Sequence, residues 1–376
     1  MDQFFSKNPK RILMTADTIG GVWTYALELV RALGPYGIEV TLATMGSSLS
    51  RDQAGEAGSI SNLEVIESSF KLEWMQEPWR DVEMAGDWLL EIAERKQPDL
   101  VHLNGYAHAA LPWQRPVLVV AHSCVLSWWA AVKRENAPAA CKPYREAVKQ
   151  GLQAADLVVA PSQAMLDSVR EHYGHPHAGL VVPNGRDAGL FKSRAKERFV
   201  LCAGRLWDEA KNAAALAHIA SDLRWPVYLA GEEQPPEGAA ARYQNVQILG
   251  RLPTCEMASW FGRAPIYALP AHYEPFGLSA LEAGLAGCAL VLGDIPSLRE
   301  VWGDAAWFVP PDDHEALKTS LRQLIADPTR LNQFATRARA RALEFTPRRM
   351  AESYLSAYSG LIEKQPDKTK EFTCAL

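Results

Sequence analysis

Short apolar segments and helical patterns alternate along most of this chain, and they do so in two successive halves. Most apolar segments are unbroken runs, which is typical of parallel sheets covered on both faces. The alternation predicts an α/β protein with two doubly wound parallel sheets. The predicted strands are 11–16, 38–44, 100–103, 117–121, 157–160, 180–182, 199–203, 227–230, 246–249, 266–269, 289–292 and 307–309. Helical patterns occur at 22–33, 213–220, 256–261, 278–286 and 315–325.

The length and composition agree with two domains of an ordinary globular protein. The chain has 376 residues, of which 48% are apolar and 22% charged, and domains average roughly 150 residues. These values exclude disordered, collagen-like, coiled-coil and disulfide-scaffold classes. The turn signal Val-Pro-Asn-Gly at 182–185 separates a predicted N-terminal lobe, 1–182, from a C-terminal lobe, 186–345. A last helix is predicted at 346–363 and a flexible tail at 364–376.

The charge distribution argues against nucleic acid and anionic membranes as partners. Residues 1–180 carry 16 basic and 21 acidic side chains, and residues 181–376 carry 23 of each, for a net charge of −5. Neither half has the basic excess that such partners require. No segment is apolar and long enough for a signal h-region or a membrane span. Six widely spaced cysteines indicate free thiols, so we expect a cytoplasmic enzyme.

Ligands of open α/β sheets bind where strands end and helices begin, and two such junctions are rich in glycine and basic residues. The adjacent Gly20 and Gly21 could present backbone N–H groups to a phosphate or a sugar, or form a plain tight turn. Gly204 and Arg205 end a strand, and Lys211 follows. Arg205 and Lys211 could bind phosphate oxygens, or they could be two solvated basic residues.

A third junction combines two carboxylates with a helix N-terminus. Glu274 lies in a loop, a helix begins near Leu278, and Glu282 lies about one turn into that helix. The amides of Phe276, Gly277 and Leu278 would face an anion, with the carboxylates on either side of it. Taken singly, Glu274 could instead compensate the helix dipole, and Glu282 could lie on a solvated helix face.

This third junction, E-P-F-G-L-S-A-L-E-A at 274–283, closely resembles the retaining GT-B glycosyltransferases of family 4. The order of the blocks agrees, and the resemblance covers essentially the whole chain. The other similar blocks are G-G at 20–21, A-D-L-V-V-A-P-S at 155–162, V-P-N-G at 182–185 and G-R-L-x-x-x-x-K at 204–211.

The resemblance implies two Rossmann-like lobes that face a cleft. Residues 1–182 would form the acceptor side, residues 186–345 would bind the donor, and the helix 346–363 would cross back onto the N-terminal lobe. Glu282 would bind the donor ribose, and Glu274 would bind the transferred sugar. The diphosphate would be bound by a larger set, namely Arg205, Lys211, Gly20, Gly21, Gly204, Phe276, Gly277 and Leu278.

Three further groups receive roles at this stage. By the resemblance, the base would lie near Arg251 and Leu252, and His122 would contact the transferred sugar, although a satisfied, partly buried histidine is the alternative from the sequence alone. Trp23, Trp128 and Trp129 could stack on an acceptor, or they could belong to the core or the lobe surface.

The predicted activity is retaining transfer of a hexose from a nucleotide diphosphate sugar to an acceptor hydroxyl. The expected donor is a UDP-sugar such as UDP-glucose, with a GDP-sugar next, and the expected acceptor is soluble or a saccharide. The chain has no D-x-D motif, so metal independence and no cofactor are predicted. The alternatives are another GT-B sugar enzyme (a phosphorylase or a nucleotide-sugar epimerase) and a non-catalytic nucleotide-sugar-binding protein. The oligomeric state is left open.

Overall fold

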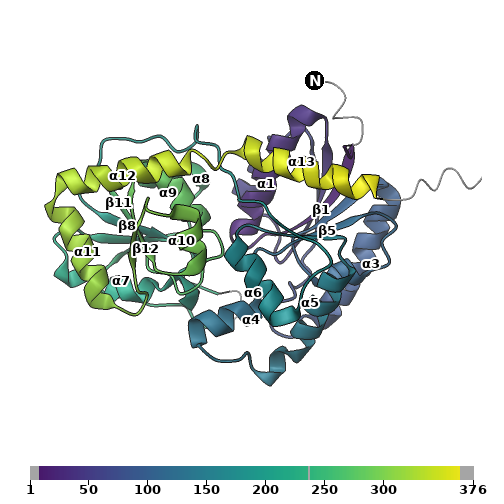
Figure 1. Ribbon diagram of the computed structural model, residues 1–376, viewed down its shortest axis with the longest axis horizontal. Helices are drawn as coiled ribbons and strands as arrows, with labels where there is room; N and C mark the ends of the chain where they lie inside the picture. The colour runs from purple at the N-terminus through teal and green to yellow at the C-terminus, as the bar shows by residue number, and fades with distance from the viewer. Residues whose placement is uncertain (1–7, 236–237, 365–376) are drawn as a thin grey trace, which may run out of the picture.

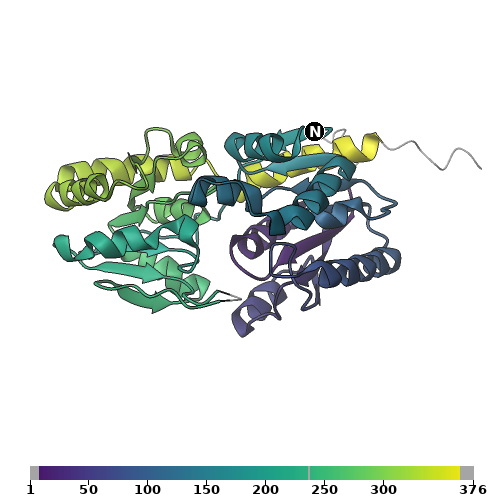
Figure 2. The same cartoon turned by 90° about the horizontal axis from the view of Figure 1, so that it is seen from below.

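The computed structural model describes residues 8–235 and 238–364, which form two lobes side by side (Figure 1). Each lobe contains one parallel sheet. The N-terminal sheet has the strand order β3-β2-β1-β4-β5-β6-β7, and the C-terminal sheet has the order β10-β9-β8-β11-β12-β13. Helices cover the sheets (Figure 2). The prediction of two Rossmann-like, doubly wound lobes is therefore confirmed.

The strands are short and mostly buried. Those of the first sheet are β1 (Arg11–Asp17), β2 (Glu39–Met45), β3 (Leu63–Glu67), β4 (Leu100–Leu103), β5 (Val117–Val120), β6 (Leu157–Ala160) and β7 (Gly179–Val181). Those of the second sheet are β8 (Val200–Ala203), β9 (Val227–Ala230), β10 (Gln247–Gly250), β11 (Ile266–Leu269), β12 (Ala289–Gly293) and β13 (Trp307–Val309).

The helices follow the strands in both lobes. In the N-terminal lobe they are α1 (Gly21–Leu33), α2 (Arg51–Gly58), α3 (Trp79–Lys96), α4 (Val125–Trp128), α5 (Lys142–Ala154) and α6 (Gln163–Tyr173). In the C-terminal half they are α7 (Ala213–Ile219), α8 (Thr254–Arg263), α9 (Leu278–Leu285), α10 (Pro296–Trp302), α11 (His314–Ala326), α12 (Pro328–Ala342) and α13 (Pro347–Glu363).

The strand that the sequence analysis did not predict is β3, at the edge of the first sheet. Its residues Leu63, Val65 and Ile66 are only half-buried, and Glu64 and Glu67 are exposed. An edge strand alternates because it has a solvated side, so a search for unbroken apolar runs passes over it. The twelve predicted strands are all present, within one or two residues of their predicted ends.

In each sheet the strand order reverses once, between β1 and β4 in the first and between β8 and β11 in the second. Loops diverge at such a switch point and leave a crevice for ligands at the carboxyl ends of the strands. The ends of β1 and β8 come together across the two lobes, since a Cβ on Gly20 would lie 3.3 Å from the Nη1 atom of Arg205.

Helix α13 leaves the C-terminal lobe and packs on α1 of the N-terminal lobe, as Figure 1 shows in yellow and purple. Its buried face includes Met350, Tyr354 and Tyr358, and the Tyr358 hydroxyl lies 2.7 Å from Nδ1 of the buried His102. The predicted crossing is confirmed. The predicted tail after residue 364 lies outside the described residues. No helix in the described ranges is long and apolar enough to cross a membrane.

The connection between the lobes leaves no room for a side chain at Gly185. A Cβ there would lie 2.4 Å from the carbonyl oxygen of Thr346, just before α13. We therefore expect Gly185→Ala to lower the free energy of unfolding by about 1–3 kcal/mol, the usual cost of overpacking. Urea denaturation measures this. The matched control is Gly360→Ala in α13, where a Cβ meets nothing within 4 Å; equal losses in both variants would contradict the prediction.

Candidate functional site

A cluster of paired charges lies beyond the carboxyl end of β8. Lys211 is the last residue of a short 3-10 helix (Glu209–Lys211), and Asp208 caps that helix by accepting from the Ala210 amide at 3.0 Å. The Arg205 Nη2 atom donates to Asp208 at 2.8 Å, and Lys211 Nζ donates to Glu274 Oε2 at 2.6 Å. Arg205 and Lys211 are therefore not two independent solvated cations.

Glu274 also occupies the helix N-terminus that the sequence analysis reserved for an anion. Its Oε1 atom accepts from the Gly277 amide at 3.0 Å, and Gly277 has a φ of 89°, a conformation that favours glycine. The carboxylate is 13% exposed and Lys211 is 14% exposed. An anionic ligand at this site must replace the Glu274 carboxylate on both the ammonium group and the amide.

Glu282 is not on a solvated helix face. Its Oε1 atom lies 2.8 Å from Nη2 of Arg186, and Nη1 of Arg186 lies 2.5 Å from Glu28 of helix α1. Arg186 is 2% exposed. Burial raises the pKa of Glu282 and of Glu28, and the Arg186 charge only partly offsets this. This buried trio, called here the Arg186 bridge, ties α1 to α9.

Asp208 joins the charge cluster to the N-terminal lobe. Its Oδ1 atom accepts from the indole Nε1 of Trp128 at 2.9 Å. Burial would raise the pKa of Asp208, but the charges of Arg205 and Lys211 outweigh it and hold the pKa below its ordinary value. Asp208 is therefore ionised: it is the counter-ion of Arg205 within the C-terminal lobe and accepts a hydrogen bond from Trp128 of the N-terminal lobe.

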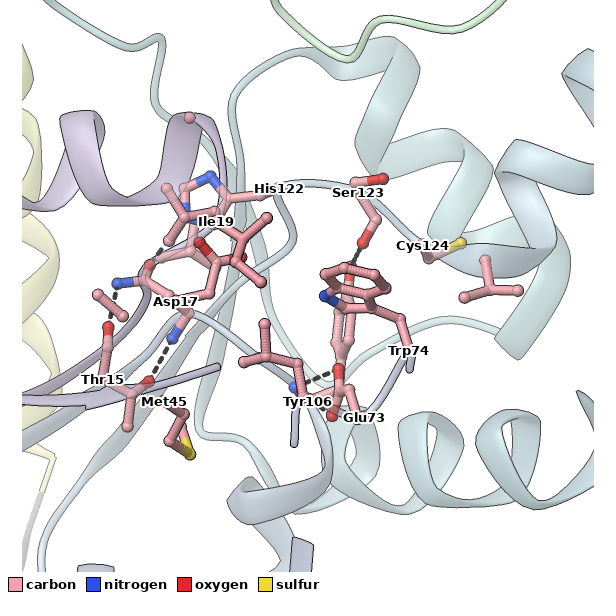
Figure 3. Close-up of a pocket in the computed structure, with 18 of the residues that line it drawn as sticks. Thr15, Asp17, Ile19, Met45, Glu73, Trp74, Tyr106, His122, Ser123 and Cys124 are labelled. Atoms are coloured by element: carbon pink, nitrogen blue, oxygen red, sulfur yellow. Dashed lines mark hydrogen bonds between the residues drawn. The ribbon is translucent and has the colours of Figure 1, made fainter. Parts of the chain in front are cut away.

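A cavity of about 390 Å³ lies against this cluster, between the strand ends of the N-terminal lobe and the Arg205–Glu209 loop. His122 follows β5 and lines the cavity (Figure 3), and its Nε2 atom lies 2.8 Å from Oδ1 of Asn104. Asn104 is held in turn by two hydrogen bonds to Thr15. Burial lowers the pKa of His122 to about 3, so the imidazole is neutral near pH 7.

Two carboxyl groups also line this cavity (Figure 3). Glu73 accepts from the backbone amides of Tyr106 and Ala107, at 3.1 and 2.8 Å. The Oδ1 atom of Asp17 is buried and has no hydrogen-bond partner among the described residues. Burial raises the pKa of Asp17 from 3.8 to about 7, although Arg205 and the Ile19 amide act in the opposite direction.

The remaining predicted residues divide between the site and its surroundings. A Cβ on Gly21 would touch Leu278 at 3.3 Å, and one on Gly204 would touch the Lys211 side chain at 3.5 Å. Phe276 is buried and its ring packs on Phe345.

Arg251 and Leu252 follow β10 and do not line the described cavity. Arg251 is exposed and Leu252 is half-buried.

The three tryptophans proposed for the acceptor side have different positions. Trp128 lines the cavity. Trp129 packs edge-on against Trp128 but is not among the lining residues. For Trp23 the acceptor interpretation is wrong, because its side chain is 4% exposed in the core of the N-terminal lobe. Trp23 is the third residue of α1, and the face it occupies is the one that packs inward.

The sequence analysis missed several residues that the structure brings to the site, namely Asp17, Glu73, Asn104, Arg186 and Asp208. Three of them had a usable signal. Asp17 ends β1, Asn104 follows β4 directly, and Arg186 follows the Val-Pro-Asn-Gly turn. A polar residue at the end of a parallel strand lies at the ligand edge of the sheet.

Two family patterns match consecutive parts of this chain. "Glycosyltransferase Family 4" matches residues 19–190, and "Glycosyl transferases group 1" matches residues 189–341. Together they cover both lobes. The chain belongs to glycosyltransferase family 4. It is a GT-B glycosyltransferase, as the resemblance implied.

Relatives of this glycosyltransferase, and solved structures of other proteins similar to it, agree with the assignment. A glycogen synthase of Mycobacterium tuberculosis is 28% identical over 72% of both chains. A D-inositol 3-phosphate glycosyltransferase of Xylanimonas cellulosilytica is 27% identical over 92% of this chain and 93% of the relative.

Among solved structures, sucrose-phosphate synthase from Thermosynechococcus elongatus superposes with a TM-score of 0.79, at 17% identity, over 95% of this chain and all of the other. Anabaena HepE in complex with UDP-glucose superposes with a TM-score of 0.74, at 16% identity, over 93% of this chain and all of the other. These likenesses show the fold.

The raised pKa of Asp17, whose Oδ1 atom is buried without a partner among the described residues, predicts an unusual pH dependence of stability. Between about pH 4 and pH 7 the folded glycosyltransferase retains a proton on Asp17 that the unfolded chain has lost, so stability falls as the pH rises through this range. We expect Asp17→Asn to remove this loss. From pH 4 to pH 8, the free energy of unfolding of the variant should rise relative to that of the parent by about 2–4 kcal/mol.

Urea denaturation at both pH values measures this difference, with Asp52→Asn as the control because Asp52 is exposed in the first turn of α2. A difference that stays constant with pH would contradict the raised pKa.

The Arg186 bridge predicts a large loss when only the cation is removed. Arg186→Met would leave two buried carboxylates, Glu28 and Glu282, without their counter-ion, so we expect the free energy of unfolding to fall by about 3–5 kcal/mol. Urea denaturation measures it. The control, Arg348→Met, breaks an exposed pair with Glu352 and should leave the midpoint unchanged; a small effect at Arg186 would show that the bridge contributes little.

Proposed function

We propose that this glycosyltransferase retains the anomeric configuration while it moves a hexose from a nucleotide diphosphate sugar to an acceptor hydroxyl. UDP-glucose is the first donor to test, and a GDP-sugar is next. The observation that carries the proposal is the Lys211–Glu274 pair at the strand ends of the C-terminal lobe, close to Arg205, which lines the cavity. The acceptor would occupy that cavity.

The donor would bind by exchanging ion-pair partners. Lys211 leaves Glu274 and binds the diphosphate, and Arg205 turns from Asp208 to the same phosphates. The Gly277 amide is released at the same time and faces the anion. Glu274 is then free to accept hydrogen bonds from the hydroxyls of the transferred sugar. Glu282, as a member of the Arg186 bridge, binds the ribose hydroxyls.

The cations supply most of the proposed rate enhancement. Negative charge develops on the leaving nucleoside diphosphate, and fixed donors aimed at that charge lower the barrier. The acceptor hydroxyl attacks on the face from which the diphosphate leaves, and a phosphate oxygen takes its proton. His122 is neutral, so it acts as a hydrogen-bonding group toward the sugar and not as an acid.

Three proposals about the setting complete this function. The acceptor is a soluble molecule or a saccharide, and the protein works in the cytoplasm. The reaction needs no metal ion, because Arg205 and Lys211 neutralise the diphosphate. HepE, solved with UDP-glucose, has the same fold and supports UDP-glucose as the first donor to test.

We expect Lys211→Ala to lower kcat by about 10²–10³-fold with the donor that the parent enzyme uses, because the variant loses one positive charge that stabilises the leaving diphosphate. Thermal shifts with UDP, GDP, ADP and their sugars, with and without EDTA, identify that donor. Proton NMR of the product then gives the anomeric configuration. Lys149→Ala, an exposed site on α5, is the control.

Several outcomes would contradict the proposal. A product with inverted anomeric configuration would reject the proposed retaining mechanism. Thermal stabilisation by a nucleotide that EDTA abolishes would reject the proposed metal independence. Conversion of the donor without any acceptor would indicate an epimerase. Stabilisation by none of the nucleotides would remove the donor assignment as a whole.

A further inference from the structure

Above about pH 7, where Asp17 is ionised, the charge that lines the cavity is predominantly negative. The side chains of His108 and His122 are neutral, since burial lowers the pKa of both. The lining has two cations and four carboxyl groups, of which Asp208 is paired with Arg205 and Glu209 with Lys133 from outside the lining. The charged lining residues are Lys71, Arg205, Asp17, Glu73, Asp208 and Glu209.

The cavity offers hydrogen-bond acceptors to a ligand. Asp17 Oδ1 is buried with no partner among the described residues, and a buried carboxylate without a donor is costly. The Nε2 atom of His122 donates to Asn104, so its Nδ1 atom is the acceptor of the ring. The second cation, Lys71, donates one hydrogen bond to the carbonyl oxygen of Gln76 at 2.8 Å.

The wall of the cavity adds aromatic surface. Trp74 and Tyr106 lie on the N-terminal side (Figure 3), and Trp128 and Trp207 lie toward the C-terminal lobe. At about 390 Å³ the cavity has the size of a site for a small molecule. Aromatic faces bind the C–H faces of a ring, while hydroxyl groups of the same ring can donate to carboxylates.

We propose that the cavity selects an uncharged polyhydroxyl acceptor, a sugar or a cyclic polyol, and that Asp17 is the residue that accepts a hydrogen bond from one of its hydroxyls. A phosphorylated acceptor is excluded because its charge would be placed beside Asp17 and Glu73. Asp17 is thus a specificity-determining residue for the proposed transfer. This inference rests on the proposed function, which places the acceptor in the cavity.

Selection by charge follows from the distribution of cations on the two sides of the site. The donor diphosphate has Lys211 and Arg205 within reach, and both would be used by it. The acceptor side then retains Asp17 and Glu73 without an equal number of cations. A phosphate group on the acceptor would have to be desolvated next to these two carboxylates, with one lysine, Lys71, in the lining to offset them. That step costs more than desolvation of a neutral hydroxyl group.

The test measures binding of small probes with UDP present, by isothermal titration calorimetry at pH 8, where Asp17 is ionised. The probes are glucose and myo-inositol, their phosphates glucose 6-phosphate and inositol 3-phosphate, and glucosamine. We expect a neutral probe to bind with a dissociation constant in the millimolar range or tighter, and each phosphate to bind at least about tenfold more weakly than its parent.

Asp17→Asn separates the role of charge from that of shape. We expect the variant to bind the neutral probe about tenfold or more weakly, because a hydrogen bond to a charged group is lost. The ratio between the dissociation constants of the phosphorylated and neutral probes should become smaller. UDP binding should not weaken, because Asp17 is a charge near Arg205 and not one of the groups proposed to bind the diphosphate. Asp52→Asn should behave as the parent does, and circular dichroism and urea denaturation verify that both variants are folded.

Four results would overturn the inference. They are tighter binding of a phosphorylated probe than of its parent, tighter binding of glucosamine than of glucose, no binding of either neutral probe, and an Asp17→Asn variant with unchanged selectivity. UDP-glucose turnover, measured on the same preparation, tests the proposed function separately. Turnover with a preference for phosphorylated acceptors would reject the inference alone, whereas neutral-probe binding without any donor turnover would reject the function alone.

Discussion

The arrangement of the two lobes depends on one buried cation. Arg186 stands in the connection between the lobes, at 2% exposure, and binds Glu28 of the first lobe and Glu282 of the second. None of the three charges can be left without the others, since an unpaired buried charge costs several kcal/mol. Helix α13 adds apolar contacts to the same junction from the opposite direction along the chain. The strand ends that carry the chemistry are thereby held against each other.

The site uses its charges in pairs before any ligand arrives. Lys211 binds Glu274 and Arg205 binds Asp208, so the cations that would receive a diphosphate are already positioned and have partners. The cost of binding the donor is then an exchange of partners and not the ordering of free side chains. Asp17 is the exception, because its Oδ1 atom has no partner in the described parts of the chain. Such a group stores unfavourable energy that a ligand can release.

Much of the fold could be predicted because the signals were local. Apolar runs located twelve strands, and the resemblance to the family implied that the last helix crosses back onto the N-terminal lobe. The edge strand β3 was not predicted, because two of its five residues are exposed and the other three are only half-buried. At the site, glycine next to a basic residue and two carboxylates around a helix N-terminus were readable. The pairing of Glu274 with Lys211, 63 positions apart, was not, because no local pattern reports it.

The sequence by itself determined the class of fold, the order of the family's blocks and the residue types available at each strand end, since strand periodicity and turn chemistry act over a few residues. Only the tertiary structure decided which of those residues meet. It placed Trp23 in the core and Trp128 in the cavity, paired Arg205 and Lys211 with carboxylates, and left the Oδ1 atom of Asp17 without a donor among the described residues. Burial and charge pairing depend on segments that are distant in the chain, and they set whether a carboxyl group is a structural counter-ion or a group that awaits a ligand.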